Sequence, residues 1–267
     1  MIPDRLSEVT IDGLRIAYEM QGAGPPLVLL HGALSDSRAW RRQLDAFADA
    51  FTVVAWDAPG CGRSSDPPAG FSLADYTDCL AGLLGALALE RPHILGLSFG
   101  GGLALQFYQR YPDVTRSLVL ASAYAGWAGS LPPEVVAERL QRGREQSSLP
   151  PEVVVPKWIP TLFLDTVPAA VIAEYAVIMA DFHPAGMRVM LEAFAEADLR
   201  DVLPTIEVPT LLLYGAEDQR SPQDVAQALH AKIPAAELVT LPGVGHVSNL
   251  EAPEAFNREV RNFLRMN

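Results

Sequence analysis

The sequence predicts an α/β fold built on a mostly parallel eight-stranded sheet flanked by helices, and three observations support this prediction. Short apolar runs alternate with stretches of helical periodicity along most of the chain. Turn-forming residues bound each apolar run, as is typical of strands covered on both faces. The chain has 267 residues and 49% apolar types, which is enough to build one large core.

The predicted elements follow in order, beginning with a hairpin. The runs Glu8–Ile11 and Leu14–Tyr18 flank Asp12-Gly13, a dipeptide that favours a two-residue turn between strands. The other predicted strands are Pro26–Leu30, Phe51–Trp56, His93–Leu97, Ser117–Ala121, Thr210–Tyr214 and Glu237–Leu241. Predicted helices between and after them are Trp40–Ala50, Leu73–Leu87, Gly102–Tyr111, Pro222–Ile233 and Pro253–Met266. This alternation predicts right-handed crossover connections.

One segment interrupts the alternation of strands and helices. No strand pattern occurs between Ala121 and Thr210. Helical patterns cover Leu131–Arg144, Pro150–Leu164, Ala169–Phe182 and Pro184–Ala197 instead. We therefore expect a core domain of residues 1–123 and 205–267, with a helical cap of residues 124–204 inserted after the sixth strand.

Charge and composition exclude several functions. The net charge of −12 and the absence of a basic block argue against nucleic-acid binding. No apolar stretch approaches the about 18 residues of a membrane span. The early charged residues Asp4, Arg5 and Glu8 argue against a secretory leader. We expect a cytoplasmic protein, a monomer or small homo-oligomer, without membrane partners.

The two cysteines and the scattered histidines indicate no metal site or disulfide framework. Cys61 lies in a predicted loop and Cys79 in a predicted helix, so both are expected to be free thiols. No Cys or His pair has the spacing of metal ligands. We expect no metal and no cofactor.

The segment Gly96-Leu97-Ser98-Phe99-Gly100 carries the clearest chemical signal. It joins a predicted strand to a predicted helix and matches the Gly-x-Ser-x-Gly pattern of a nucleophile elbow. A serine on so tight a turn requires small neighbours, which Gly96 and Gly100 provide. Ser98 is therefore the candidate nucleophile.

A serine nucleophile needs a base and an acid that orients the base. His246 lies in a glycine-rich loop after the last strand, at the sheet edge where open α/β sheets build their sites. The preceding strand ends in Glu217-Asp218, and we favour Asp218 as the acid, with Glu217 as the alternative. The strand before that ends Ser122-Ala123, without a carboxylate.

Two backbone amides are expected to bind the developing oxyanion. One is the N–H of Phe99, which follows the nucleophile. The second is the N–H of Ala33, in the loop His31-Gly32-Ala33-Leu34 after an early strand.

The remaining polar candidates are given structural roles. His31 is expected to anchor its loop, and Asp57 to accept hydrogen bonds from turn amides. His93 is expected at the surface, and His230 on a solvated helix face. His183 lies in the cap, where contact with substrate is the alternative to a structural role.

Together these motifs resemble the α/β-hydrolase superfamily over nearly the whole chain outside the cap. The resemblance rests on His31-Gly32, the Asp57–Ser64 loop, the Ser98 elbow, Asp218 and Gly245-His246. The segment 245–257 is also similar to 3-oxoadipate enol-lactonases and nearby carboxylesterases. The resemblance implies a Ser98–His246–Asp218 triad, an acyl-enzyme, and a small ester or lactone substrate.

Candidate substrate-binding residues are large and apolar. They are Leu34, Trp127, Trp158, Phe163, Met179, Phe182 and Val247. A substrate with a carboxylate would need a cation, for which the cap offers Arg139, Arg142, Arg144, Lys157 and Arg188.

Two other functions remain open. One is hydrolysis of a carbon–carbon bond in a vinylogous diketone, although that group usually has an aromatic residue where Val247 stands and a more glycine-rich loop at Ala33-Leu34. The other is a non-catalytic receptor for a small ligand. Dehalogenases and epoxide hydrolases of this fold are disfavoured because they use an aspartate where Ser98 stands.

Overall fold

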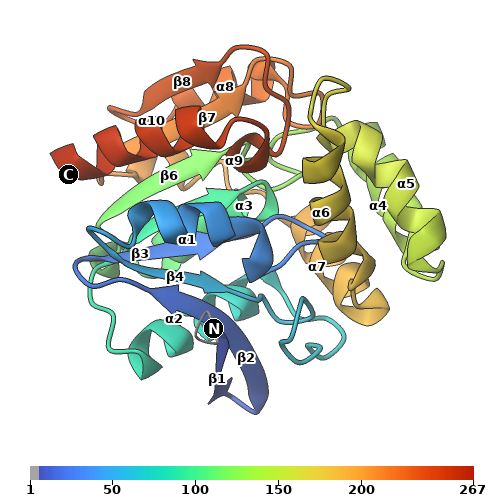
Figure 1. The fold of residues 1–267 in the computed structure, drawn as a ribbon, viewed down its shortest axis with the longest axis horizontal. Helices are drawn as coiled ribbons and strands as arrows, with labels where there is room; N and C mark the ends of the chain where they lie inside the picture. The colour runs from blue at the N-terminus through green and yellow to red at the C-terminus, as the bar shows by residue number, and fades with distance from the viewer. Residues whose placement is uncertain (1–5) are drawn as a thin grey trace.

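The computed structural model describes residues 6–267, and a single twisted sheet runs through it (Figure 1). The strand order is β1-β2-β4-β3-β5-β6-β7-β8. β2 is antiparallel to β1 and β4, and all other neighbouring strands are parallel. The bounds are β1 Leu6–Ile11, β2 Leu14–Gln21, β3 Pro26–Leu30, β4 Thr52–Trp56, β5 His93–Leu97, β6 Ser117–Ala121, β7 Thr210–Gly215 and β8 Glu237–Leu241. The predicted fold class is confirmed.

The predicted hairpin is present, with longer strands than the sequence pattern indicated. Ile11 pairs with Leu14 across the turn. Asp12 and Gly13 both have positive φ, at 48° and 85°. This is the backbone geometry that a two-residue turn needs to match the twist of its strands.

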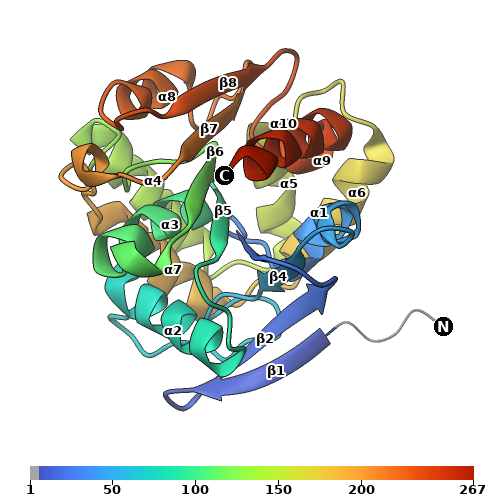
Figure 2. The same ribbon diagram turned by 90° about the vertical axis from the view of Figure 1, so that its left-hand side faces the viewer.

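Helices cover both faces of the sheet (Figure 2). α1 (Arg41–Phe47) and α10 (Pro253–Met266) pack together on one face. α2 (Leu73–Ala86), α3 (Phe99–Arg110) and α8 (Gln223–His230) lie on the other. The central strands β5 and β6 are buried along their whole length, so the core lies on both sides of them. Short elements are the 3₁₀ turns η1 Ser37–Trp40, η2 Pro112–Val114 and η3 Leu203–Thr205, and the helix α9 Ser248–Glu251.

Four helices lie between β6 and β7, as the sequence pattern predicted. They are α4 Pro133–Gln146, α5 Pro151–Leu162, α6 Ala169–Ala180 and α7 Pro184–Glu196. Each begins at or just after a proline, which the first turn of a helix tolerates. We refer to residues 124–204 as the helical insertion, and in Figure 1 its helices lie together at one end of the sheet.

α3 begins at Phe99, earlier than the expected start at Gly102. The run of glycines has low helix propensity, but close packing of this first turn against β3 holds it in helical conformation. α1 is also shorter than expected, because Ser37–Trp40 forms a separate 3₁₀ turn.

No helix within residues 6–267 has the length and apolar character to span a bilayer. Cys61 and Cys79 are both buried and unpaired with each other, as predicted. Asp4 and Arg5, on which part of the prediction about a leader depends, lie outside the described residues.

Candidate active site

Ser98 stands on a strained turn between β5 and α3. Its backbone has φ 56° and ψ −112°, a region that residues with a side chain rarely adopt. Such a conformation costs about 1–3 kcal/mol and persists only where the surrounding structure enforces it. The Ser98 N–H donates to the carbonyl of Ala121 over 2.9 Å, which ties the turn to β6. The side chain remains partly exposed.

The two flanking glycines cannot carry a side chain. A Cβ at Gly96 would lie 2.1 Å from the carbonyl oxygen of Gly100. A Cβ at Gly100 would lie 2.1 Å from the carbonyl oxygen of Leu30, at the end of β3. Both distances are far below van der Waals contact, so the glycines allow the strand and the helix to meet at Ser98.

Asp218 and His246 form a buried hydrogen-bonded pair. Nδ1 of His246 lies 2.9 Å from Oδ2 and 3.0 Å from Oδ1 of Asp218. Asp218 is 4% exposed and His246 is 3% exposed. Asp218 also accepts backbone N–H bonds from Arg220 and Ser221, each 2.9 Å long.

The environment of Asp218 favours its ionised form. Burial alone would raise the pKa of this carboxyl group. The charge of His246, the hydrogen bond from its ring and the Ser221 N–H outweigh burial and lower the pKa below its ordinary value. Asp218 is therefore a carboxylate that can hold His246 in one orientation.

Glu251 holds the loop that carries His246, a role that sequence reasoning missed. Its carboxylate accepts the N–H of Gly245 over 3.0 Å and that of Val247 over 3.1 Å. The His246 N–H donates to Leu162 of α5 over 3.2 Å. Three successive amides around the histidine are thus satisfied. The only available signal was an acidic residue shortly after the histidine.

The loop after β3 lies against the nucleophile. A Cβ at Gly32 would lie 3.5 Å from Cβ of Ser98. Within residues 6–267, the N–H groups of Ala33 and Phe99 have no hydrogen-bond acceptor. Two free donors beside one serine match the requirement for an oxyanion hole.

Ser98 itself is not hydrogen-bonded to His246. In the described part of the chain, the hydroxyl group has no partner, and His246 Nε2 has none either. The predicted acid and base are therefore hydrogen-bonded to each other. Ser98 lies at the same sheet edge but makes no direct hydrogen bond to His246. Such bonds often tighten only when substrate binds.

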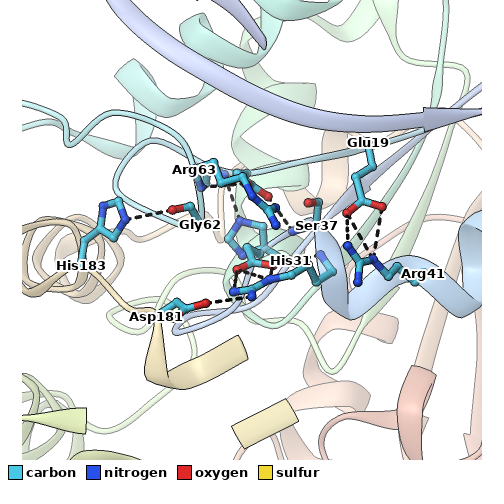
Figure 3. A network of polar contacts seen from close by, with 12 residues as sticks. Glu19, His31, Ser37, Arg41, Gly62, Arg63, Asp181 and His183 are labelled. Atoms are coloured by element: carbon cyan, nitrogen blue, oxygen red, sulfur yellow. Dashed lines mark hydrogen bonds and ion pairs between the residues drawn. The ribbon is translucent and has the colours of Figure 1, made fainter. Parts of the chain in front are cut away.

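His31, labelled in Figure 3, and Asp57 each connect segments of the loops near the site. His31 Nε2 accepts the Ala58 N–H over 3.0 Å, so its Nδ1 carries the proton and donates to the Gly32 carbonyl over 2.8 Å. Asp57 accepts the N–H of Ser37 over 2.8 Å and that of Arg63 over 2.9 Å. Both residues anchor loops, as predicted, although Asp57 bridges two loops rather than closing a local turn.

Charged groups attach the helical insertion to these loops. His183 Nδ1 lies 2.6 Å from Asp66 Oδ1, and its Nε2 lies 3.0 Å from the Gly62 carbonyl (Figure 3). Asp181 lies 2.8 Å from Arg38, which also pairs with Asp36 over 2.7 Å. We call the His183 and Asp181 contacts the anchors of the insertion.

A narrow cavity separates the insertion from the loop that carries Ala33. Its water-accessible volume is about 10 Å³, room for about one water molecule. The lining includes Leu34 and Phe182 among the predicted pocket residues, and also His183. The space beneath the insertion is therefore nearly closed.

The other predicted pocket residues lie elsewhere. Trp127 and Trp158 line a separate cleft in the insertion. Phe163, Met179 and Val247 are buried, with Phe163 packed edge-on against Tyr175.

The prediction that His93 lies at the surface is wrong. It is 1% exposed, pairs with Ser117 over 2.6 Å and packs edge-on against Phe51. The reason is that β5 is a central strand with neighbours on both sides. His230 is exposed, as predicted. In residues 6–267, no three His, Cys, Asp or Glu residues are grouped as metal ligands.

Comparison with known proteins extends these observations to a family. The Alpha/beta hydrolase family matches residues 27–259. A 2-hydroxy-6-oxononadienedioate/2-hydroxy-6-oxononatrienedioate hydrolase from Burkholderia vietnamiensis is 31% identical, over 94% of this chain and 91% of its own. The Mycobacterium tuberculosis protein Rv2715 is 39% identical over 121 residues, and the matched part of this chain spans only 36% of that relative's length.

Two solved structures have nearly the same fold. A thermophilic esterase from Thermogutta terrifontis, with malate bound, is 28% identical and has a TM-score of 0.90 over 98% of both chains. The enol-lactonase from Burkholderia xenovorans LB400 is 26% identical and has a TM-score of 0.90 over 97% of this chain and 100% of its own.

Proposed function

This chain belongs to the alpha/beta hydrolase family, and on that premise we propose that it is a serine hydrolase that cleaves a carboxylic ester or lactone. The observation that carries the proposal is the buried His246–Asp218 pair at the same sheet edge as the strained Ser98. Similarity to a solved esterase and to a solved enol-lactonase supports this substrate class.

In the proposed first step, Ser98 Oγ attacks the carbonyl carbon of the substrate. His246 Nε2 takes the hydroxyl proton, and Asp218 stabilises the resulting imidazolium. The carbonyl oxygen becomes an oxyanion between the Ala33 and Phe99 amides. When the carbon–oxygen bond to the leaving group breaks, His246 returns the proton to the departing alkoxide, and an acyl-enzyme remains on Ser98.

In the second step, water replaces the alcohol. His246 removes a proton from the water, the hydroxide attacks the acyl carbon, and Ser98 leaves with the proton that His246 returns. The products are a carboxylic acid and the free enzyme. For a lactone the alcohol group formed in the first step stays attached to the acyl group, so the product released is a single hydroxy acid.

The helical insertion is proposed to act as a cap over this site. The narrow cavity beside Ala33 is lined by Leu34, Phe182 and other apolar side chains of the insertion, which suit an acyl group, and also by the polar side chains of Asp36, Asp181 and His183. Since the space holds about one water molecule, an acyl chain requires displacement of the cap or its side chains. The residues that lie outside this cavity, Trp127, Trp158, Phe163, Met179 and Val247, remain predictions as substrate contacts.

The test of the proposed function is removal of the nucleophile. Ser98→Ala is expected to abolish hydrolysis of p-nitrophenyl acetate, and a fluorophosphonate is expected to label Ser98 in the unmodified protein. Ser148→Ala, at an exposed serine of the insertion, is the matched control and is expected to retain full activity. Equal hydrolysis by the Ser98→Ala protein would refute the proposal.

A second candidate is hydrolysis of a carbon–carbon bond by the same residues. It is favoured by the 31% identity to a hydrolase named for 2-hydroxy-6-oxononadienedioate. Val247 and the Ala33-Leu34 loop argue against it, because that group usually has an aromatic residue and a more glycine-rich loop at these positions. Comparing kcat/KM for a dienoic diketone and for p-nitrophenyl acetate separates the two functions, and a preference of more than about tenfold identifies the reaction.

A further inference from the structure

A second cleft lies between α4 and α5 of the helical insertion and the core loop that follows Asp218. Its water-accessible volume is about 240 Å³, much larger than that of the cavity beside Ala33. The cationic side chains on its walls are Arg139, Arg142, Lys157 and Arg220. No carboxylate lines it among the described residues.

Three of these cations have no acidic partner in residues 6–267. Arg139 donates to two neutral acceptors, the Tyr124 hydroxyl over 3.2 Å and the Arg220 carbonyl over 3.0 Å. Arg220 donates to the Thr161 hydroxyl over 2.9 Å, and Lys157 makes no ion pair. Among the four cations of the cleft within residues 6–267, only Arg142 forms an ion pair, with Glu138 one turn earlier on the exposed face of α4. Positive charge in the cleft is therefore largely uncompensated.

Arg220 carries the largest electrostatic cost. Burial, together with the positive charge of Arg139, lowers the pKa of its guanidinium group, although the nearby Tyr124 hydroxyl and the Asp218 carboxylate act in the opposite direction. Its guanidinium stacks over the ring of Trp158 at 4.5 Å from the centroid, which recovers part of that cost. A negatively charged group in the cleft would relieve the remainder.

This concentration of cations contrasts with the rest of the chain. The net charge of the protein is −12, which is opposite in sign to the charge of the cleft. The cleft also has aromatic walls, Trp127 and Trp158. Of the two indole groups, Trp158 uses its N–H to donate to Gln146 over 2.7 Å and thus has a fixed orientation.

We propose that this cleft is a binding site for a small organic dianion with a flat apolar body, such as an aromatic dicarboxylate or an aryl phosphate. More than one negative charge is needed to balance several cations, and the indole walls suit a flat apolar body. The site is separate from the cavity beside Ala33, with which it shares no lining residue. The proposal does not depend on the hydrolase reaction.

Isothermal titration with phthalate and with phenyl phosphate tests the proposal, using the Ser98→Ala protein to prevent turnover. At low ionic strength the expected dissociation constant is about 1 mM or tighter for at least one probe. The tighter probe identifies the anionic group. Uncharged phthalamide is expected to bind at least about tenfold more weakly, and added salt is expected to weaken binding of both anions.

Charge-neutralising variants locate the binding. Lys157→Gln and Arg142→Gln are each expected to weaken binding about fivefold or more. Lys232→Gln is the matched control, because Lys232 is an exposed lysine that does not line the cleft. Circular dichroism melting of each variant checks that the fold is retained.

Three results would overturn the proposal. The first is that neither phthalate nor phenyl phosphate binds to the folded protein. The second is equal affinity of the Lys157→Gln, Arg142→Gln and Lys232→Gln proteins. The third is loss of binding when the unmodified protein is labelled at Ser98 by a fluorophosphonate. That result would mean that the anion binds near Ser98 and not in the cleft. If the proposed hydrolase function is wrong and the fluorophosphonate does not label Ser98, the first two results still test the proposed anion site.

Discussion

Nδ1 of His246 lies almost equally far from the two carboxylate oxygens of Asp218, at 3.0 and 2.9 Å. A carboxylate only accepts hydrogen bonds, so Nδ1 must carry a proton and Nε2 is left with a free lone pair in the neutral ring. The pair therefore fixes the tautomer that a general base requires. Because both groups are buried, this preference is not weakened by competition from water.

Asp218→Asn tests this relationship. The amide of asparagine can donate to Nδ1 and so favours the wrong tautomer, and kcat for p-nitrophenyl acetate is expected to fall about 10³- to 10⁴-fold. KM is expected to change little, because Asp218 does not line the cavity beneath the insertion. The neighbouring Glu217→Gln is the control and is expected to stay within about twofold of the parent activity. A larger loss in Glu217→Gln than in Asp218→Asn would reassign the acid.

Gly100→Ala tests the packing that forms the elbow. The added Cβ would lie 2.1 Å from the Leu30 carbonyl oxygen, and backbone atoms on both sides must move to relieve the clash. The free energy of unfolding is expected to fall by at least about 3 kcal/mol. Gly85→Ala in α2 is the matched control, because nothing lies within 4 Å of its added Cβ. It is expected to stabilise the protein by about 0.5–1 kcal/mol. Similar urea midpoints for both variants would contradict this account.

The sequence places Ser98, Asp218 and His246 each after a predicted parallel strand, and the structure has a strand before each of them. The carboxyl ends of such strands meet at one edge, so residues distant in sequence come together there. Glu251 was not predictable in this way. Its role depends on a side chain that reaches back to the Gly245 and Val247 amides, and hydrophobic periodicity carries no information about such contacts.

The burial of His93 could not be predicted from the sequence for a different reason. Its place at the first residue of a strand suggested exposure, but exposure depends on which strands lie beside it. β3 and β6 flank β5, and His93 pairs with Leu27 on one side and Ser117 on the other. Strand order is a tertiary property, so a residue at a strand end can be deeply buried.

The buried His93 predicts a pH-dependent stability. Burial, followed by the positive charge of Arg116, lowers the pKa of His93 from 6.5 to about 4. Between these values the unfolded chain binds a proton that the folded protein does not, so acid favours unfolding. The contribution of His93 to the free energy of unfolding is fully present above pH 6.5 and declines as the pH falls toward 4. The loss amounts to roughly 3 kcal/mol by pH 4.

Urea unfolding of the parent and His93→Gln proteins at pH 7, 5.5 and 4.5 measures this contribution. Glutamine has no titrating group, so the free energy of unfolding of His93→Gln is expected to fall less steeply with acid than that of the parent. His230→Gln, at the exposed histidine, is expected to keep the parent slope. Equal slopes for all three proteins would mean that His93 does not contribute.

The anchors of the insertion predict how access to Ser98 is controlled. Both partners of His183, the Asp66 carboxylate and the Gly62 carbonyl, are acceptors, so the ring satisfies both contacts only as an imidazolium. Asp181 supplies the second anchor through Arg38. A partly exposed ion pair contributes about 0.2–1 kcal/mol, so loss of one anchor raises the open fraction by about 1.4-fold to fivefold.

His183→Ala and Asp181→Asn are therefore each expected to raise the kcat/KM ratio of p-nitrophenyl octanoate to p-nitrophenyl acetate by about 1.4-fold to fivefold. The longer acyl chain gains more, because the cavity beside Ala33 holds about one water molecule and must widen to admit it. The double variant is expected to multiply the two effects, since the anchors are independent contacts. Glu138→Gln breaks an ion pair within α4 that does not join the insertion to the core, so it is the control and is expected to leave the ratio unchanged. An unchanged ratio in the double variant, with the protein folded and Ser98 still labelled, would mean that these contacts do not limit entry of the acyl chain.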